Sequence, residues 1–170
     1  MSSAARAFAY AAHLGQKYGE YHYITHLDHT VDILTRFGLV DKEFPELFAA
    51  AYLHDTIEDT KVTYDDIAAV FGIRVAYLVS AVTDQPGKNR KDRHARTYPR
   101  IRAGGPWAIM VKLADRIANV ETSSRGPNKQ KLDMYKKEYT EFREALYIPQ
   151  QPDTIEKMWA HLDSLLGYKV

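Results

Sequence analysis

The stretch AAAYLHDTIEDT, residues 49–60, joins an apolar helical run to a group of polar side chains at its end. His54 and Asp55 are adjacent, and Glu58 and Asp59 follow them at i+4, so a helix or helical turn stacks two pairs at one end. Polar residues and His are common where a helix terminates, but carboxylates are unfavourable at its negative C-terminus. Three acids there favour a compensating metal cation over simple helix termination.

Apolar residues recur with a period near 3.6 along the chain, and alternation with period two is missing. This pattern predicts an all-α fold, a single-domain helical bundle with a core over about residues 4–122 and C-terminal helices over about 130–166. We expect helices over residues 4–16, 28–37, 45–57, 64–71, 73–83, 90–102, 107–122, 130–146 and 154–166.

Capping and turn residues separate these predicted helices. Thr63 followed by Asp66 is typical of a capping box, and Gly72 is a natural stop for the helix between them. Pro residues at 45, 106 and 152 fit first helical turns. Short loops are expected over residues 84–88, 104–106 and 126–128, and they are too short to be interdomain linkers.

Composition excludes several classes of protein. With 170 residues, 45% of them hydrophobic, the chain can bury a core, and it contains no apolar run of the length that spans a bilayer. We expect a cytoplasmic protein with no membrane partner. The absence of Cys excludes disulfides and thiolate metal ligands, so a metal must use His and carboxylate groups.

The net charge of +1 gives the whole molecule little attraction for nucleic acid, which is therefore an unlikely partner. Residues 88–102, KNRKDRHARTYPRIR, nevertheless hold seven Lys or Arg against one Asp. This segment is either a solvated helix face or a surface that attracts an anionic ligand.

Further metal ligands must come from other segments, and the chain has only seven His. His26 and His29 lie together in YITHLDHT, residues 23–30, and either reaches a metal from the start of the second predicted helix. One of the two is then surplus.

Asp115 lies inside the apolar segment MVKLADRIANVET, residues 110–122, with Lys112 and Asn119 one turn away on either side. A buried carboxylate is costly unless it is paired or binds a metal. Arg116 is expected to point away from Asp115, by about 100° around the helix. Asp115 is therefore a candidate metal ligand, and an ordinary salt bridge is the alternative.

Together these segments resemble the HD metal-dependent phosphohydrolase superfamily, whose pattern is a His, an adjacent His-Asp pair and a distant Asp. In this chain the pattern falls on His26, His54, Asp55 and Asp115. LHDTIEDT at 53–60, the FG turn at 71–72, LVSAVTD at 78–84 and VKLADRIANV at 111–120 look like the hydrolase domain of the RelA/SpoT alarmone enzymes. A chain with no room for a synthetase domain is more similar to the small alarmone hydrolases.

The resemblance covers about residues 4–122 and implies one HD hydrolase domain over residues 1–170. It implies that the four matched residues bind Mn²⁺, or another divalent metal, and that His29 is the surplus His. It assigns Glu58 and Asp59 to water activation and places Asn119 beside the substrate sugar. The implied reaction removes the 3′-pyrophosphate from guanosine tetra- or pentaphosphate, (p)ppGpp, and Lys112 and the basic segment offset the substrate charge.

The loop before His26 departs from the family pattern HxGQxRKxGxPYIxHP. Here HLGQKYGEYHYITHL, residues 13–27, is one residue shorter and keeps Lys17 but not the Arg-Lys pair that contacts guanine. Tyr18 and Tyr21 lie nearby, and aromatic stacking is able to replace guanidinium stacking. Lys17 and Tyr18 are therefore candidate substrate-binding residues, with guanine as the leading base.

Two other functions compete with this interpretation. Another HD phosphohydrolase would act on a deoxynucleoside triphosphate or a nucleoside monophosphate with the same metal. A regulatory module would bind the nucleotide without turnover, although pure binding has no evident need for both Glu58 and Asp59. The sequence leaves the oligomeric state open.

Overall fold

The structure is a computed structural model that describes residues 1–126 and 129–169. The predicted loop over residues 126–128 therefore lies mostly outside the described residues. The helices are α1 (Ser2–Ala12), α2 (Ile24–Arg36), α3 (Pro45–Leu53), α4 (Thr56–Asp59), α5 (Tyr64–Phe71), α6 (Ile73–Val82), α7 (Arg90–Ala103), α8 (Gly105–Arg125), α9 (Lys129–Leu146) and α10 (Asp153–Leu166). The prediction of an all-α fold is confirmed.

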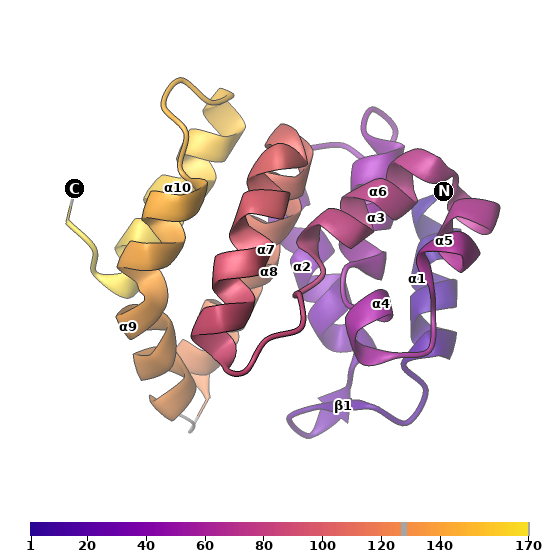
Figure 1. Ribbon diagram of the computed structural model, residues 1–170, viewed down its shortest axis with the longest axis horizontal. Coiled ribbons are helices and arrows are strands. Elements are labelled where there is room, and N and C mark those ends of the chain that lie inside the picture. Colours follow the sequence, from indigo (N-terminus) through magenta and orange to yellow (C-terminus); the bar gives the residue numbers. More distant parts are fainter. Residues whose placement is uncertain (127–128, 170) are drawn as a thin grey trace.

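Helix α8 is the centre of the bundle. It packs against α2, α3, α6, α7, α9 and α10, and 13 of its 21 residues are buried. In Figure 1, α9 and α10 lie on one side of α7 and α8, while α1, α3, α5 and α6 lie on the other. Polar side chains that α8 carries at buried positions therefore face neighbours on several sides.

The hydrophobic core joins both sides of the bundle. Ala5 and Ala9 of α1 are fully buried, and these small side chains let α1 approach α3 closely. On the other side, Tyr139, Phe142 and Trp159 are the largest fully buried side chains. None of the described helices is both long and apolar enough to cross a membrane.

The local stop and cap signals at α5 act as predicted. Thr63 Oγ1 accepts from the Asp66 backbone N–H, and the Asp66 carboxylate accepts from the Thr63 N–H, which forms a complete capping box. Gly72 then ends α5 with a φ of 91°, a conformation that glycine adopts without strain.

The expected helix over residues 45–57 is broken at His54 and Asp55. The Thr56 hydroxyl donates a 2.6 Å hydrogen bond to the Leu53 carbonyl, which a continuous helix would satisfy with a backbone N–H. Asp55 has φ −97° and ψ −4°, outside the regular helical values, before α4 begins at Thr56. Across the break the adjacent side chains of His54 and Asp55 converge, with His54 Nε2 2.9 Å from Asp55 Oδ2.

Other segments also differ from the sequence prediction. The first helix, predicted over residues 4–16, spans Ser2–Ala12, and residues 13–15 form a turn in which Gly15 has a φ of 87°, outside the helical range. Helix α2 begins at Ile24 rather than at residue 28. No side chain caps its N-terminus, so no capping residue marks this start in the sequence. A small antiparallel hairpin, β1 (Lys17–Tyr18) paired with β2 (Tyr21–His22), precedes it. Strands of two residues are too short to leave an alternating pattern.

Candidate active site

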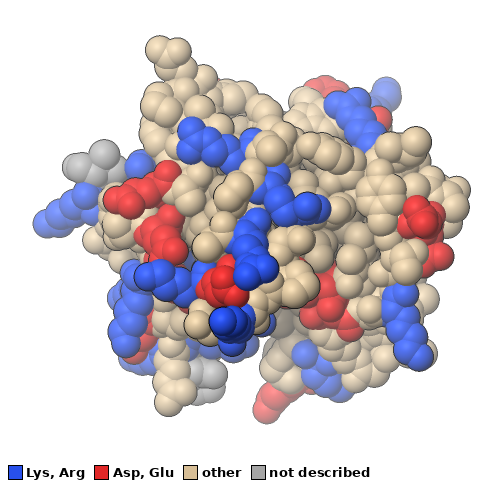
Figure 2. All heavy atoms as spheres, in the orientation of Figure 1, with Lys and Arg blue, Asp and Glu red and all other residues tan. Residues whose placement is uncertain are grey.

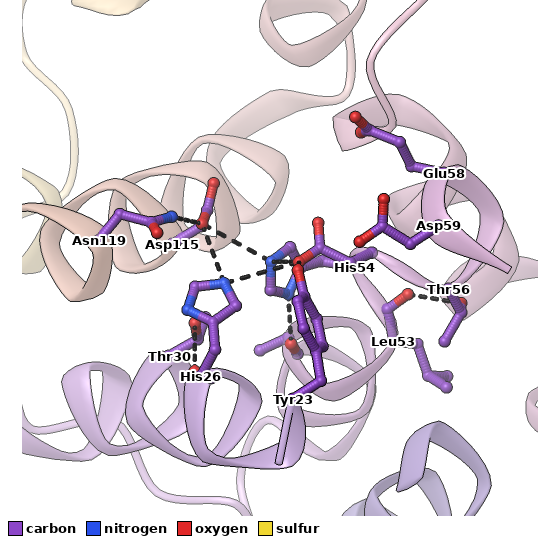
Figure 3. Close-up of polar contacts among 12 residues, drawn as sticks. Tyr23, His26, Thr30, Leu53, His54, Thr56, Glu58, Asp59, Asp115 and Asn119 are labelled. Carbon is purple, nitrogen blue, oxygen red and sulfur yellow. Dashed lines mark hydrogen bonds and ion pairs between the residues drawn. The ribbon is translucent and has the colours of Figure 1, made fainter. Parts of the chain in front are cut away.

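The four predicted metal ligands converge from three parts of the chain. His26 comes from the first turn of α2, His54 and Asp55 from the break between α3 and α4, and Asp115 from the middle of α8. The break matters because it allows two adjacent side chains to reach the same point. Figure 3 shows the imidazoles of His26 and His54 facing the carboxylate of Asp115.

Their polar atoms lie within a few ångströms of one another. His26 Nε2 is 3.3 Å from Asp115 Oδ1 and 3.6 Å from Asp55 Oδ2. His54 Nε2 is 2.9 Å from Asp55 Oδ2 and 3.7 Å from Asp115 Oδ1. Ligand atoms from His26, His54 and Asp115 all lie within 4.8 Å of one another, a spacing able to hold a metal ion.

The hydrogen bonds of His54 fit a metal ligand. Its Nδ1 lies 2.8 Å from the carbonyl oxygen of Ala51, which only accepts, so Nδ1 carries the proton. In the neutral ring, Nε2 then presents a lone pair, and this buried atom has no hydrogen-bond partner. A lone pair facing two carboxylates is repulsive unless a proton or a cation lies between them. Two imidazoles and two carboxylates suit a divalent first-row metal.

The same arrangement shifts the pKa values of the cluster. Burial alone would lower the pKa of His54, but Asp55 and Asp115 raise it well above its ordinary value. Burial would raise the pKa of Asp115, but Lys112 and the two imidazoles hold it well below its usual range. Burial would likewise raise the pKa of Asp55, but the two imidazoles lower it. Asp55 and Asp115 are therefore ionised and able to bind a cation, and protons on the imidazoles compete with a metal.

Neighbouring side chains fix the orientation of the carboxylates. The Tyr23 hydroxyl donates to Asp55 Oδ2 at 2.6 Å. Asn119 Nδ2 donates to Asp115 Oδ1 at 2.5 Å, and Lys112 Nζ is 3.3 Å from Asp115 Oδ2. Such contacts hold a ligand in one geometry before the metal arrives.

A polar cavity of about 220 Å³ opens onto this cluster. Glu58 and Asp59 reach it from α4, and Figure 3 shows both carboxylates on the α4 side of the cluster. Glu58 accepts a 3.1 Å hydrogen bond from the Asp84 backbone N–H. Burial and the nearby Asp84 carboxylate raise the pKa of Glu58, which makes it a better proton acceptor than an ordinary glutamate.

Cationic side chains also line the cavity. Lys112 and Arg116 come from α8, and Arg90 comes from α7 together with His94. Burial and the Arg90 charge lower the pKa of His94 to about 4, so its imidazole is neutral near pH 7. The cavity therefore presents both carboxylates and positive charge.

Arg116 is directed to Glu138, 3.8 Å from its Nη1, whereas Asp115 pairs with Lys112. Arg116 lines the same cavity as Asp115, although its guanidinium lies over the rings of Tyr135 and Phe142 at 4.9 and 4.3 Å. Helix α9 covers this side of α8, and the long Arg116 side chain lies between the two helices.

The predicted substrate-binding residues divide into two pairs. Lys112 and Asn119 line the cavity, whereas Lys17 is exposed on β1 and lies outside it. The Tyr18 ring stacks on His26 with 4.8 Å between ring centroids, and Tyr18 also lines a separate depression beside Arg36. Tyr18 is therefore packed against a candidate ligand rather than directed into the cavity.

His29 lies away from the cluster. Its Nε2 is 3.0 Å from Glu121 Oε2, within a group of charges that also contains Arg36 and His161. Although His26 and His29 are one helical turn apart on α2, they face different neighbours. The structure thus brings together His26, and not His29, with the other three candidates.

Several lining residues were not singled out from the sequence. Arg90 and His94 lie in the basic segment 88–102, whose composition indicated anion attraction without identifying a residue. Figure 2 shows a band of Lys and Arg side chains where α7 lies in Figure 1, and most of that band faces solvent. Tyr23 and Tyr135 carried no signal, because a tyrosine beside an apolar pattern looks like core.

The chain is similar to known proteins that contain an HD domain. The HD domain family matches residues 5–142. A guanosine-3′,5′-bis(diphosphate) 3′-pyrophosphohydrolase of Aquifex aeolicus is 44% identical over 80 residues, which cover 45% of this chain and 12% of that protein. The MESH1 enzymes of the same name from Danio rerio and Homo sapiens are 34% and 36% identical over 103 and 104 residues, each covering 61% of this chain and 56% of the relative. The chain thus spans about half the length of these MESH1 relatives.

Solved structures share the fold. A structure described as a metazoan orthologue of SpoT that hydrolyses ppGpp superposes with a TM-score of 0.80 at 22% identity, covering 99% of this chain and 96% of the other. A Listeria monocytogenes structure superposes with a TM-score of 0.67 at 23% identity, covering 85% and 96%. With the family match over most of its length, the chain belongs to the HD domain family.

Proposed function

We propose that this protein is a metal-dependent hydrolase that removes the 3′-pyrophosphate from guanosine 3′,5′-bis(diphosphate) and its pentaphosphate counterpart. The observation that carries the proposal is one cavity in which His26, Asp55 and Asp115 meet an acidic pair and a set of cations. His54 lies beside this lining, with its Nε2 2.9 Å from Asp55 Oδ2. The names of the Aquifex aeolicus and MESH1 relatives support the choice of substrate.

An HD domain hydrolase requires a divalent metal, and the donor set of two imidazoles and two carboxylates suits Mn²⁺. When bound, such an ion supplies Lewis-acid polarisation of a phosphoryl oxygen and lowers the pKa of a coordinated water. We infer Mn²⁺ as the cofactor because four protein ligands leave positions free for water and phosphate in an octahedral ion.

The acidic pair, Glu58 and Asp59, accepts the proton of the attacking water. The oxygen of water forms a bond to the phosphorus next to the 3′ oxygen, and the bond from that phosphorus to the 3′ oxygen breaks. Glu58 or Asp59 accepts the water proton, and the 3′ oxygen leaves with a proton as a free hydroxyl. The products are pyrophosphate and guanosine 5′-diphosphate, or guanosine 5′-triphosphate when the substrate is the pentaphosphate.

The cations hold the phosphate charge. Lys112, Arg90 and Arg116 line the cavity, and an alarmone carries several negative charges to be neutralised there. A cavity of about 220 Å³ is smaller than the ~300–1,000 Å³ typical of whole ligands. It therefore encloses the reacting phosphates, and the base extends toward its rim.

A substrate panel with Mn²⁺ tests the proposal. We expect guanosine 3′,5′-bis(diphosphate) to yield pyrophosphate and guanosine diphosphate in equal amounts, with kcat/KM at least tenfold above any deoxynucleoside triphosphate or nucleoside monophosphate. A tenfold preference corresponds to about 1.4 kcal/mol of transition-state stabilisation. The variant Asp55→Asn should lose activity, and Asp65→Asn, at the start of α5, serves as a matched carboxylate control.

Two results would contradict the proposal. Release of triphosphate or orthophosphate from another nucleotide at a higher kcat/KM would leave a hydrolase with a different substrate. Stoichiometric nucleotide binding without turnover, in protein loaded with Mn²⁺, would instead favour the regulatory module.

A further inference from the structure

We infer that Gln16 is a positioning residue that orients Asp59, and that His13 holds Gln16 in the orientation this requires. The inference deepens the proposed function, since it rests on a role for Asp59 in hydrolysis. Gln16 Nε2 donates to Asp59 Oδ2 at 2.8 Å, and Gln16 Oε1 lies 2.8 Å from His13 Nδ1. These residues connect the end of α1 with the end of α4.

The donor and acceptor chemistry allows only one orientation of the Gln16 amide. The Asp59 carboxylate only accepts hydrogen bonds, so the amide NH₂ must face Asp59 and the amide oxygen must face His13. That oxygen also only accepts, so His13 Nδ1 must carry the proton. A rotation of the amide by half a turn would place oxygen against a carboxylate.

His13 is fixed by its surroundings. Its side chain is buried, and its ring is stacked on Tyr23 with 4.6 Å between ring centroids and 19° between the ring planes. The Tyr23 hydroxyl donates to Asp55 Oδ2 at 2.6 Å. One imidazole therefore supports the partners of two different carboxylates, Asp59 through Gln16 and Asp55 through Tyr23.

The backbone between His13 and Gln16 is built for this contact. The Gln16 N–H donates to the His13 carbonyl at 2.9 Å, which closes a tight turn. Gly15 within the turn has a φ of 87°, a backbone conformation that glycine adopts readily and other residues rarely adopt. The turn brings the Gln16 side chain back alongside the His13 ring.

Asp59 needs an external partner because of its position. It is the last residue of α4, which is only four residues long, and it is exposed. An exposed carboxylate at a helix end samples several rotamers, and fixing it during the reaction would cost side-chain entropy. The hydrogen bond from Gln16 fixes the Asp59 rotamer in the folded protein before the reaction, so that Asp59 stays directed at the cavity.

A purely stabilising role for Gln16, as a tie between α1 and α4, makes different predictions. The variant Gln16→Met keeps the length of the side chain and removes both polar atoms. We expect kcat to fall about tenfold, the effect of one lost oriented hydrogen bond to a charged group, while KM and Mn²⁺ affinity stay within twofold. Gln130→Met, an exposed Gln on α9, is the matched control.

A double-mutant cycle shows whether Gln16 acts through Asp59. In the Asp59→Ala background, measured by single turnover, Gln16→Met should cause no further loss. A full tenfold loss in that background, or equal changes in kcat, KM and Mn²⁺ affinity with a large fall in Tm, would make Gln16 a structural tie instead.

A measurement without substrate separates this inference from the proposed function. In metal-free protein, the side-chain NH₂ resonances of Gln16 in ¹⁵N-correlated NMR spectra should shift on Asp59→Ala and on His13→Ala. Unchanged resonances would overturn the inference even in an active enzyme. Shifted resonances in a protein that hydrolyses no nucleotide would keep the contact and reject the proposed function alone.

Discussion

The Tyr18 hydroxyl donates a hydrogen bond of 2.8 Å to Asn119 Oδ1, across 101 residues of sequence. Asn119 Nδ2 donates in turn to Asp115 Oδ1, so both ends of this amide are engaged within the protein. The resemblance to the alarmone hydrolases implied that Asn119 lies beside the substrate sugar. A sugar hydroxyl that reaches Asn119 Oδ1 must therefore replace or join Tyr18. The hairpin that departs from the family pattern is thus connected to a candidate metal ligand.

Removal of the Tyr18 hydroxyl should weaken metal binding. Tyr18→Phe keeps the ring on His26 but releases Asn119, and loss of an orienting partner typically costs 10- to 100-fold in metal affinity. Because Tyr18 acts through Asn119, we expect the lower end of that range, about tenfold, in Mn²⁺ titration calorimetry. Tyr21→Phe is the control, since Tyr21 is exposed on the same hairpin. Equal affinities for both variants would show that the Tyr18 hydroxyl does not support the site.

Glu58→Gln and Asp59→Asn should each lower turnover by about 100-fold or more, as expected for groups that accept or position a proton. Metal content should stay near that of the unsubstituted protein, because the ligand atoms of His26, His54 and Asp115 remain. Steady-state kinetics and elemental analysis of the same samples check both parts. If both variants lost metal and excess Mn²⁺ restored their activity, these residues would be ligands or supports of ligands.

Metal removal should destabilise the protein in a way that depends on His26. Mn²⁺ at 100 times its dissociation constant raises the free energy of unfolding by about 2.7 kcal/mol, provided that it binds only the folded state. We expect a chelator to lower Tm, and His26→Ala to abolish this response. His29→Ala is the control, because His29 contacts Glu121 instead. A response that survives His26→Ala and disappears in His29→Ala would reverse the ligand assignment.

Glu121 should make stability depend on acid. Burial opposes its charge, but hydrogen bonds from Arg36, His161 and His29 lower the pKa of Glu121 to about 2 from an ordinary value of 4.5. Its folded-state pKa is below the unfolded value, so its contribution to stability is present above pH 4.5 and is lost as pH falls toward 2. Chemical unfolding of the unsubstituted protein and Glu121→Gln should therefore give free energies that differ most near pH 6 and converge on acidification.

The matched control for this pH series is Glu141→Gln, on an exposed position of α9. Its difference from the unsubstituted protein should stay small and nearly constant with pH. A Glu121→Gln difference that does not change between pH 6 and pH 3 would show that this carboxylate is not stabilised by its neighbours.

The helices could be predicted because each buries an apolar face with regular spacing, and α8 carries that pattern for most of its length. The candidate cluster could also be predicted from the sequence. Carboxylates at a helix C-terminus are electrostatically unfavourable, and Asp115 in an apolar helix is costly to bury. The choice of His26 over His29 came from the resemblance. In the structure it follows from the rotation of α2, which turns one His to Asp115 and the other to Glu121.

Other features depend on contacts that no local pattern records. The break at His54 is accompanied by a hydrogen bond from the Thr56 hydroxyl to the Leu53 carbonyl, which the apolar spacing of the segment does not indicate. Arg116 faces the cavity because α9 packs over it. The hydrogen bonds from His13 to Gln16 and from Gln16 to Asp59 join the end of α1 to α4. The proximity of these two segments is a property of the whole bundle.

The separation of the candidate ligands along the chain also bears on how a functional molecule forms. As the polypeptide is synthesised, His26, His54 and Asp55 emerge well before Asp115, and no local segment contains the set. Two long chain segments, residues 27–53 and 56–114, must close into loops before all four residues meet. The entropy lost on closing them is offset only when α8 docks against α2 and α3. Under the proposed ligand set, tight metal binding therefore requires that α8 has docked. A nascent chain that lacks α8, or one with α8 misplaced, would hold its ion weakly and be distinguishable on that basis alone.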